Sequence, residues 1–185
     1  MDLRKLVWAI RLKIKSPLFK KVGRYSYMGA PISLIGTKRI TIGNKVRIYP
    51  GSRMETHNGG TIVISDSCSI AQNFHITSGY SELLIGSNTT IAGNVFVTNI
   101  DHEYKNVGLH IMDQPMIGKK TVIGENCFIG YGAAIQAGTI LGKHCVVGTN
   151  AVVRGEFPDY SVIVGVPARI VKQYNKETGK WERVK

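Results

Sequence analysis

The chain has 185 residues, of which 43% are hydrophobic, so it can bury the core of one domain with short extensions. A formal net charge of +12 predicts attraction to anions, such as nucleic acid, a membrane surface, an anionic saccharide or a phosphorylated cofactor. The basic residues are dispersed or terminal, without an aromatic platform among them, which argues against nucleic-acid binding. The few cysteines, and the lack of a cleavable signal or an apolar run that could span a bilayer, predict a cytoplasmic protein.

Residues 1–22 predict an amphipathic helix. Apolar side chains follow helical spacing along one stripe, at Leu3, Leu6, Val7, Ile10 and Ile14. Asp2 suits the N-cap, and Pro17 should end the helix. The remaining surface is basic, through Arg4, Lys5, Arg11, Lys13, Lys15, Lys20 and Lys21. The stripe can pack against the protein's own oligomer or make a peripheral contact with the inner face of the cytoplasmic membrane, and the sequence leaves both readings open.

A period of six residues dominates the second half of the chain. Aliphatic residues recur at Ile117, Ile123, Ile129, Ile135, Leu141, Val147 and Val153. Glycine directly follows five of them, and a small residue lies four positions after each of the first six. Neither a helical period of 3.6 nor two-residue alternation produces this pattern. A short strand with a tight turn does, because glycine fits where a Cβ would collide, and three such units would close one triangular coil.

Coils of three hexads predict a specific stacking between successive turns of the chain. Like residues should lie over like, in the pairs Thr121 and Thr139, Cys127 and Cys145, and Ala133 and Ala151. Earlier aliphatic residues continue the register, at Ile42, Ile48, Ile64, Ile70, Ile76, Ile85, Ile91 and Val97. We therefore expect stacked coils through most of the chain.

The register fails between Val97 and Ile117, and the sequence leaves open whether Ile111 already resumes it. We expect residues 99–116 to form a loop that protrudes from one corner of the prism and begins near His102. A loop on a rigid scaffold can reach a neighbouring subunit and hold a polar side chain in place. This break is therefore the first candidate for a functional site.

The hexads "IGENCF", "IGYGAA", "LGKHCV" and "VGTNAV", followed by "SVIVGVPARIVK", resemble those of the hexapeptide-repeat acyltransferases. The resemblance covers residues 30 to about 172 and implies an all-β fold, a left-handed parallel β-helix. The period alone does not give that hand. The resemblance divides the chain into a basic helix with a linker at 1–29, the β-helix domain at 30–165 and a C-terminal tail at 166–185.

Shorter motifs resemble the branch of this family that O-acetylates sugars of bacterial surface polysaccharides. They are "DHEY", where the loop begins, and "VVRGEFPDYSVIVGVPARIVKQYN" with "WERV" near the end. The resemblance implies an acetyl-CoA-dependent sugar O-acetyltransferase of lipopolysaccharide O-antigen or capsule, forming a homotrimer with active sites between adjacent chains. Two alternatives stay open, because the same prism can carry other functions. They are an N-acetyltransferase of an amino sugar nucleotide and a noncatalytic trimeric scaffold.

The resemblance implies that His102 is the general base. Acyl transfer from a thioester to a hydroxyl needs a base that works near neutrality, and imidazole is suited to it. Asn73, in "IAQNFHI", corresponds to a family asparagine that orients the acceptor or the reacting carbonyl, because an amide both donates and accepts hydrogen bonds. The plainer readings are a loop histidine that caps a turn and a satisfied turn asparagine.

The acetyl-CoA donor should bind along the coils after the loop. By family correspondence, Tyr131 and Thr149 contribute backbone contacts to pantetheine, and Arg154 and Arg169 meet the CoA phosphates through charge-assisted bonds. Phe128 replaces a tryptophan common in the family, which removes a ring N–H contact but keeps an apolar wall. Ordinary surface cations and a core or interface aromatic are the plainer readings.

Two other chemistries can be weighed. Cys68, Cys127 and Cys145 occupy the small inward position of a hexad, which predicts apolar filler rather than a nucleophile. A zinc site would need converging histidines. The histidines do not supply an obvious set, although His75 and His102 could approach each other, and we expect no metal.

Overall fold

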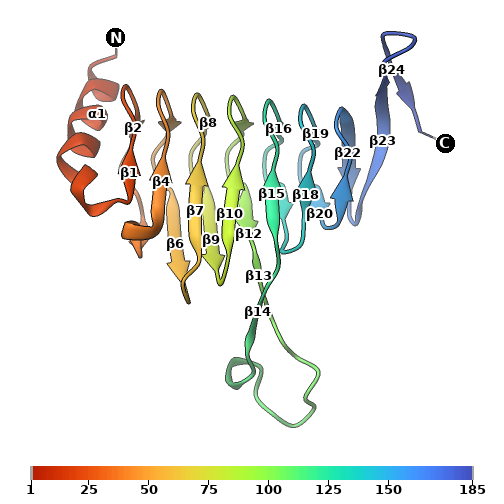
Figure 1. Ribbon diagram of the computed structural model, residues 1–185, viewed down its shortest axis with the longest axis horizontal. Helices are drawn as coiled ribbons and strands as arrows, with labels where there is room; N and C mark the ends of the chain where they lie inside the picture. Colours follow the sequence, from red (N-terminus) through yellow and green to blue (C-terminus); the bar gives the residue numbers. More distant parts are fainter. Residues whose placement is uncertain (1, 185) are drawn as a thin grey trace.

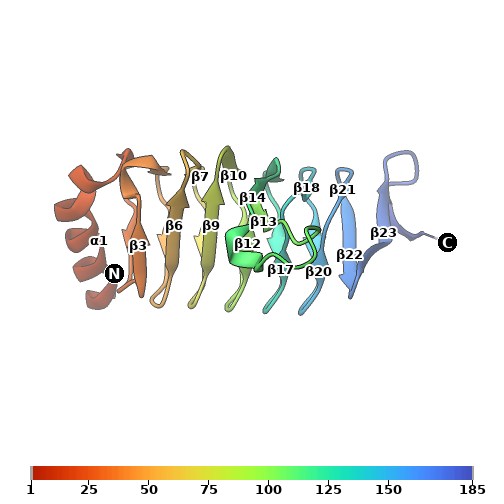
Figure 2. The same ribbon diagram turned by 90° about the horizontal axis from the view of Figure 1, so that it is seen from below.

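The computed structural model describes residues 2–184 and confirms a parallel β-helix (Figure 1). Within that range, three parallel sheets form the sides of an elongated prism. A helix covers one end of the prism, and antiparallel strands continue its other end. A loop leaves the prism near the middle of its length, and Figure 2 shows the same loop end-on, from below.

Each complete coil contributes one strand to each sheet, so strands far apart in sequence lie side by side. The first sheet is β1 (Lys21–Val22), β4 (Ile40–Ile42), β7 (Thr61–Ile64), β10 (Glu82–Ile85), β15 (Thr121–Ile123), β18 (Ile140–Leu141) and β21 (Glu156–Phe157). The second is β2 (Tyr27–Met28), β5 (Arg47–Ile48), β8 (Ser69–Ile70), β11 (Thr90–Ile91), β16 (Phe128–Ile129), β19 (Val146–Val147) and β22 (Ser161–Gly165), extended by β23 (Ala168–Asn175) and β24 (Lys180–Arg183). The third is β3 (Ser33–Ile35), β6 (Arg53–His57), β9 (His75–Gly79), β12 (Phe96–Thr98), β17 (Ala134–Ile135) and β20 (Val152–Val153).

The six-residue period is confirmed, because aliphatic side chains of successive coils stack in the core. Ile123 pairs with Leu141, and Ile129 pairs with Val147, 18 residues further along in each case. All four side chains are buried, as are the earlier residues of the same register, Ile42, Ile48, Ile64, Ile70, Ile76, Ile85, Ile91 and Val97. Burial stabilises the fold by roughly 1.5–3 kcal/mol for each such side chain, so neighbouring coils hold one another in register.

Glycine follows the aliphatic residue where two coils come very close. A Cβ on Gly124 would lie 2.4 Å from the backbone oxygen of Gly142 in the next coil. No side chain fits into that space. The collision expected from the sequence is therefore confirmed at this position.

Helix α1 (Leu3–Lys15) has the ends that the sequence predicts. The Asp2 carboxylate accepts a hydrogen bond from the Arg4 backbone N–H at 3.0 Å. The 3-10 turn η1 (Ser16–Leu18), which contains Pro17, follows the helix directly. Strands β1 and β2 then already belong to the first coil, so the prism begins at Lys21 rather than at the expected residue 30.

The face of α1 that packs on the first coil is not the predicted apolar stripe. The Trp8 ring centroid lies 6.1 Å from that of Tyr27 and 6.0 Å from that of Tyr49, and Leu12 is buried. The stripe is exposed along its whole length, at Leu3, Leu6, Val7, Ile10 and Ile14. Its own chain therefore does not cover it.

The loop returns to the prism in a different register from the one expected. Strands β13 (Ile100–His102) and β14 (Met116–Gly118) pair antiparallel as a stalk, and the 3-10 turn η3 (Ile111–Asp113) lies beyond it. Ile117 pairs with Asp101 in the stalk instead of filling a core position, and Ile111 is exposed. A β-branched residue suits either ladder, which is why the period alone misplaced Ile117.

The expected tail forms a hairpin that extends the second sheet. Strand β23 pairs antiparallel with β22, and β24 pairs antiparallel with β23. The Tyr174 and Trp181 rings pack edge to face across this hairpin, with centroids 5.6 Å apart. Among residues 2–184, no helix has both the length and the apolar character needed to cross a bilayer.

Candidate active site

Asn99 anchors the loop where it leaves the prism. Its buried side-chain Oδ1 accepts a hydrogen bond from the Gly79 N–H at 2.7 Å, and its Nδ2 donates to the Ser81 carbonyl at 3.2 Å. Its backbone oxygen accepts from the Lys119 N–H at 2.7 Å, on the returning side of the loop. Both ends of the loop are therefore tied to one buried residue, which gives the stalk a firm base.

Gln114 organises the far part of the loop. Its buried side-chain Nε2 donates to the carbonyls of Asn106 and Leu109 at 3.1 Å and 3.0 Å, and its Oε1 accepts from the Asn106 N–H at 3.2 Å. These bonds hold together two segments that share no strand pairing. The loop is thus folded around one amide side chain.

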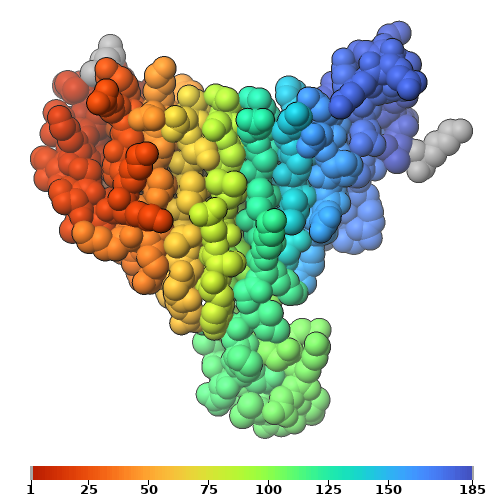
Figure 3. All heavy atoms as spheres, viewed as in Figure 1, coloured from red at the N-terminus to blue at the C-terminus, as the bar shows by residue number. Residues whose placement is uncertain are grey.

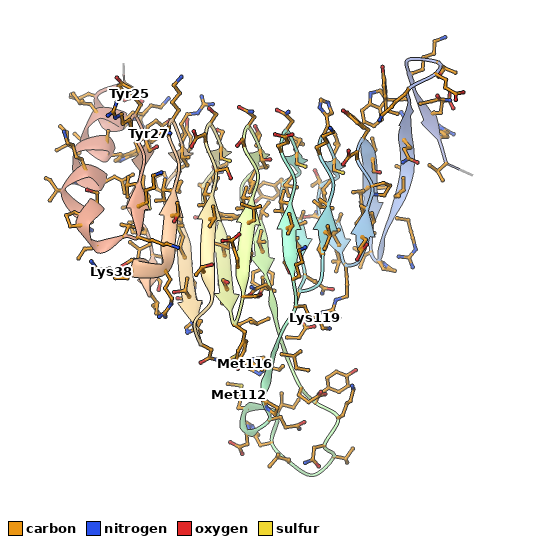
Figure 4. The ribbon with its side chains drawn as sticks, in the orientation of Figure 1. Tyr25, Tyr27, Lys38, Met112, Met116 and Lys119 are labelled. Carbon is orange, nitrogen blue, oxygen red and sulfur yellow. The ribbon has the colours of Figure 1, made fainter. Side chains whose placement is uncertain are left out.

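His102 lies at the outer end of β13, opposite Met116 in β14, and its side chain is exposed. Figure 4 labels Met116 on the stalk and Met112 in the η3 turn just beyond it. The loop does contain a histidine that caps a turn, but it is His110, whose Nδ1 accepts from the Met112 N–H at 3.2 Å. That plainer role is therefore filled by the other histidine of the loop.

His102 borders a hollow of about 400 Å³ between the loop and the next coils. Other residues lining it come from both strands of the stalk and from the turn after β20, among them Asp101, Glu103, Tyr104, Lys119 and Arg154. A hollow of this size is in the range that holds a small ligand. Its wall combines an imidazole with carboxylates and cations, which suits a polar or charged substrate.

Asp101 joins the stalk to the later coils through charge. Its Oδ2 accepts from Lys119 Nζ at 3.0 Å and also from the guanidinium of Arg154. A second carboxylate lies beside this pair, at Glu103. The Tyr104 backbone N–H donates to the Glu103 carboxylate at 3.0 Å and holds its pKa below the usual range. Lys119 and Arg154 therefore share one carboxylate, and Arg154 keeps further donors for an anionic ligand.

Asn73 and Tyr131 lie at a different corner of the prism, where Asn94 links them. Asn73 lies in the turn before β9 with a left-handed φ of 57°, and its Nδ2 donates to Asn94 Oδ1 at 3.0 Å. Asn94, also left-handed, donates in turn to the Tyr131 hydroxyl. The Asn73 amide is thus engaged in a stack of corner residues, as the plainer reading of a satisfied turn residue expects.

The remaining predicted donor-site residues are also on the surface. Phe128, on β16, is 47% exposed, and Thr149 is exposed in the turn after β19. Arg169 is exposed on β23, where its guanidinium donates to the Ala168 carbonyl at 2.9 Å. All three are reachable by a ligand.

Five of the seven predicted residues therefore form two groups within one chain. His102 and Arg154 lie at the corner between the third and first sheets, whereas Asn73, Tyr131 and Thr149 lie at the corner between the second and third. Asn73 does not line the hollow beside His102. A site that uses both groups needs a second copy of the chain to bring the two corners together.

Among the residues that sequence reasoning missed, three make the side-chain contacts that join these clusters. Asp101 and Lys119 lie in the His102 hollow, and Asn94 links Asn73 to Tyr131. Asp101 directly precedes His102, so the sequence could have indicated that it lies near the site. The place of Lys119 depends on the stalk register, for which no sequence signal exists.

The cysteines are apolar filler, as predicted. Burial raises the pKa of the Cys68 thiol to about 11, and a hydrogen bond with Cys145 together with burial raises the pKa of Cys127. All three are buried. A buried thiol without access to substrate cannot act as the acyl acceptor.

His75 lies apart from the loop. Its ring centroid is 5.0 Å from that of Phe96, its Nε2 is 3.1 Å from Thr77 Oγ1, and burial lowers its pKa. Across the described residues, 2–184, no three side chains of the metal-binding types converge. His75 is therefore a packed side chain of the third sheet.

The family model described as bacterial transferase hexapeptide (six repeats) matches residues 120–155. WbbJ of Escherichia coli (strain K12), provisionally named a lipopolysaccharide biosynthesis O-acetyl transferase, is 36% identical over 153 residues, which cover 78% of this chain and 76% of WbbJ. The chain belongs to the hexapeptide-repeat acyltransferases. It spans only about half the length of several other curated relatives, such as staphylococcal serine acetyltransferases.

Solved structures of two acyltransferases share the fold. A serine-to-cysteine mutant of AntD, an N-acyltransferase from Bacillus cereus, was solved with dTDP-4-amino-4,6-dideoxyglucose and coenzyme A and is 20% identical, with a TM-score of 0.79 over 91% of this chain and 90% of its own. VCA0836, a hexapeptide-repeat acetyltransferase from Vibrio cholerae, was solved with acetyl-CoA and is 23% identical, with a TM-score of 0.58 over 91% and 78%. At these identities the likeness concerns the fold.

Proposed function

We propose that this acyltransferase moves the acetyl group of acetyl-CoA to a sugar hydroxyl of a bacterial surface polysaccharide or its precursor. The observation that carries the proposal is the exposed His102 on an anchored stalk, beside a hollow that also holds Arg154. The name of the relative WbbJ supports the O-acetyl reaction, and the VCA0836 complex supports the donor. The acceptor class rests on WbbJ and on the sequence motifs alone.

In the proposed reaction, His102 takes the proton from the acceptor hydroxyl as that oxygen attacks the thioester carbonyl carbon. A C–O bond forms, and the carbonyl oxygen carries the negative charge of the tetrahedral intermediate. The C–S bond then breaks, and the CoA sulfur leaves with the proton that the imidazolium returns. The base must be held in place for this, which is what the bonds of Asn99 to both ends of the loop provide.

The donor would lie along the coils after the loop, with Phe128, Tyr131 and Thr149 beside the pantetheine arm. Arg154 and Arg169 would meet its phosphates, since a guanidinium pairs with phosphate oxygens in a bidentate manner. In a homotrimer, the loop of one chain would face the Asn73 corner of the next. A light-scattering mass of three times the 20.3 kDa chain is expected, and a monomer at micromolar concentration would contradict the trimer.

The test is a CoA-release assay with acetyl-CoA and fractionated surface glycans. Replacing His102 by Ala should lower turnover by about a hundredfold or more while CoA affinity stays nearly unchanged. His110→Ala is the matched control, because it removes the other histidine of the same loop and should retain turnover. Equal turnover of His102→Ala and the wild type would reject the assignment.

A second experiment tests whether the acetyl group is transferred to a hydroxyl oxygen or to an amine nitrogen of the acceptor. Products from matched hydroxyl and amino sugars should be separated by mass and by alkaline lability, since O-acetyl esters hydrolyse in mild base and amides do not. Ester product supports the proposal, and amide product alone would replace it with the N-acetyltransferase. Failure to bind CoA in calorimetry would instead indicate a scaffold.

A further inference from the structure

The end of the prism that carries α1 presents an apolar surface that the chain leaves uncovered. Leu3 and Ile14 are each 73% exposed, and Ile10 is 51% exposed. The opposite face of the helix already packs on the first coil through Trp8 and Leu12. Because folding requires only that inner face, the outward stripe needs another explanation.

Positive charge borders the stripe on both sides. The residues Arg4, Arg11 and Lys15 are spaced by seven and four positions and so run along one flank of the helix, and Lys13 lies on the other flank. All four are exposed. Asp2 is already paired with Arg4 at 3.1 Å, and the sequence has no further acidic residue before Lys21. An apolar strip between two cationic margins complements a surface that is anionic outside and apolar beneath.

The surface continues beyond the helix. A hollow of about 590 Å³ lies between α1 and the first coil, with Ile10 and Lys13 on one wall and Arg24 and Tyr25 on the other. Tyr25 is 83% exposed and lies beside α1 (Figure 4). Cations above apolar walls, with an aromatic side chain at the edge, are typical of contacts at the headgroup layer of a bilayer.

The stripe faces in a different direction from the three sides of the prism. Figures 1 and 2 show α1 lying across the end of the solenoid, with the loop emerging near the middle of its length. The face opposite the first coil therefore points away along the long axis. Chains that pack side by side would leave this end free.

We infer that α1 is a docking surface for a bilayer with anionic lipid headgroups, on which the prism stands by its N-terminal end. The stripe enters the boundary between headgroups and acyl chains, and the flanking cations meet lipid phosphates. The catalytic hollow then lies above the membrane surface, at a height fixed by the stacked coils. This inference does not depend on which group the enzyme acetylates.

The experiment is co-sedimentation of the full chain with vesicles of phosphatidylcholine containing roughly 30% phosphatidylglycerol, against phosphatidylcholine alone. Binding to the anionic vesicles is expected at about 0.05 M salt and should fall at least about fivefold by about 0.5 M. Phosphatidylcholine alone should sediment little protein. Wild-type protein that stays in solution with anionic vesicles at low salt overturns the inference.

Variants on two exposed surfaces separate docking from a general effect of added charge. The double variant Ile10→Glu/Ile14→Glu should lose about tenfold in bound fraction, because it places carboxylates in the stripe. Val107→Glu/Ile111→Glu is the matched control, since both residues are exposed in the loop. It adds the same charge and should bind within about twofold of the wild type. Equal loss in both pairs would show that net charge alone is responsible.

A second copy of the chain is the competing occupant of the stripe. Light scattering without vesicles should give the same mass for the wild type and for Ile10→Glu/Ile14→Glu. A wild-type mass twice that of the double variant would mean that two assemblies stack end to end through α1. That result, with no binding to vesicles, overturns the membrane assignment.

Discussion

The body of the prism and the loop differ in what holds each of them together. In the body, many strands contain only two residues, such as β16 and β19, and each pairs with a strand of the coil on either side. Figure 3 shows the coils packed as adjoining bands, with the loop projecting from them. In the loop, side chains do this work, chiefly Asn99 at the base and Gln114 further out. The body is therefore fixed by repetition, and the loop is fixed by a few polar anchors.

This difference explains where the chemistry lies. A change inside one coil alters the surface on which the next coil stacks, so the body leaves little freedom for new side chains. The loop must keep its anchors, but positions between them face solvent or the hollow. His102 is held by two such constraints, the Asn99 base of the loop and its own pairing with Met116 in the stalk.

The largest effect on stability is expected in the body. Ile129→Ala should lower the free energy of unfolding by about 2–5 kcal/mol, because it opens a cavity between β11 and β19 in a fully buried stack. Val107→Ala removes a side chain that is 95% exposed in the loop and should stay within about 0.5 kcal/mol. Denaturant titration of both variants measures the contrast, and similar losses would mean that the loop is part of the cooperative core.

An intermediate effect is expected at the base of the loop. Asn99→Ala should cost about 1–3 kcal/mol, since it leaves the Gly79 N–H without its acceptor in a buried place. Amide exchange in residues 100–118 should quicken more than in the coils, because the stalk loses its base. Asn106→Ala, an exposed asparagine of the same loop, is the control. Unchanged exchange in Asn99→Ala would show that strand pairing alone holds the stalk.

The smallest effect is expected where loop and body meet through charge. Arg154→Gln should raise the KM for acetyl-CoA by roughly tenfold with kcat within about twofold, the scale of one charge-assisted bond to phosphate. Lys119→Gln removes the other cation on Asp101 and should leave the KM unchanged. Steady-state kinetics distinguishes the two. Equal KM values for both variants and the wild type would remove Arg154 from the donor site.

Sequence reasoning was strongest where contacts repeat at a constant separation. Ile123, Ile129 and Gly124 were placed correctly because each contacts the residue 18 positions later. Their neighbours in space can therefore be read directly from the repeat. It failed at Ile117, whose spacing fits the hexads but whose partner is Asp101 in the stalk. A period cannot distinguish two ladders that accept the same side chain.

The candidate site was recognised in part. The break in the hexads led to His102, and family resemblance added Arg154, which the structure places at the same hollow. The contacts of Lys119 with Asp101 and of Asn73 with Asn94 could not be read, because they depend on how a non-repeating hairpin pairs and on which turns stack at a corner.

Helix α1 shows the same limit of prediction from sequence, at the N-terminal end of the chain. Its cap, its length and its two-sided character follow from local sequence, since an N-cap and a proline act within one turn. Which side faces the prism does not follow from local sequence, because the Trp8 ring packs on those of Tyr27 and Tyr49 and Leu12 is buried, while the longer apolar stripe is left outside. Local and periodic interactions join residues that are adjacent or regularly spaced in the sequence, so the sequence alone determines them. Contacts between non-repeating segments exist only once the whole chain has packed.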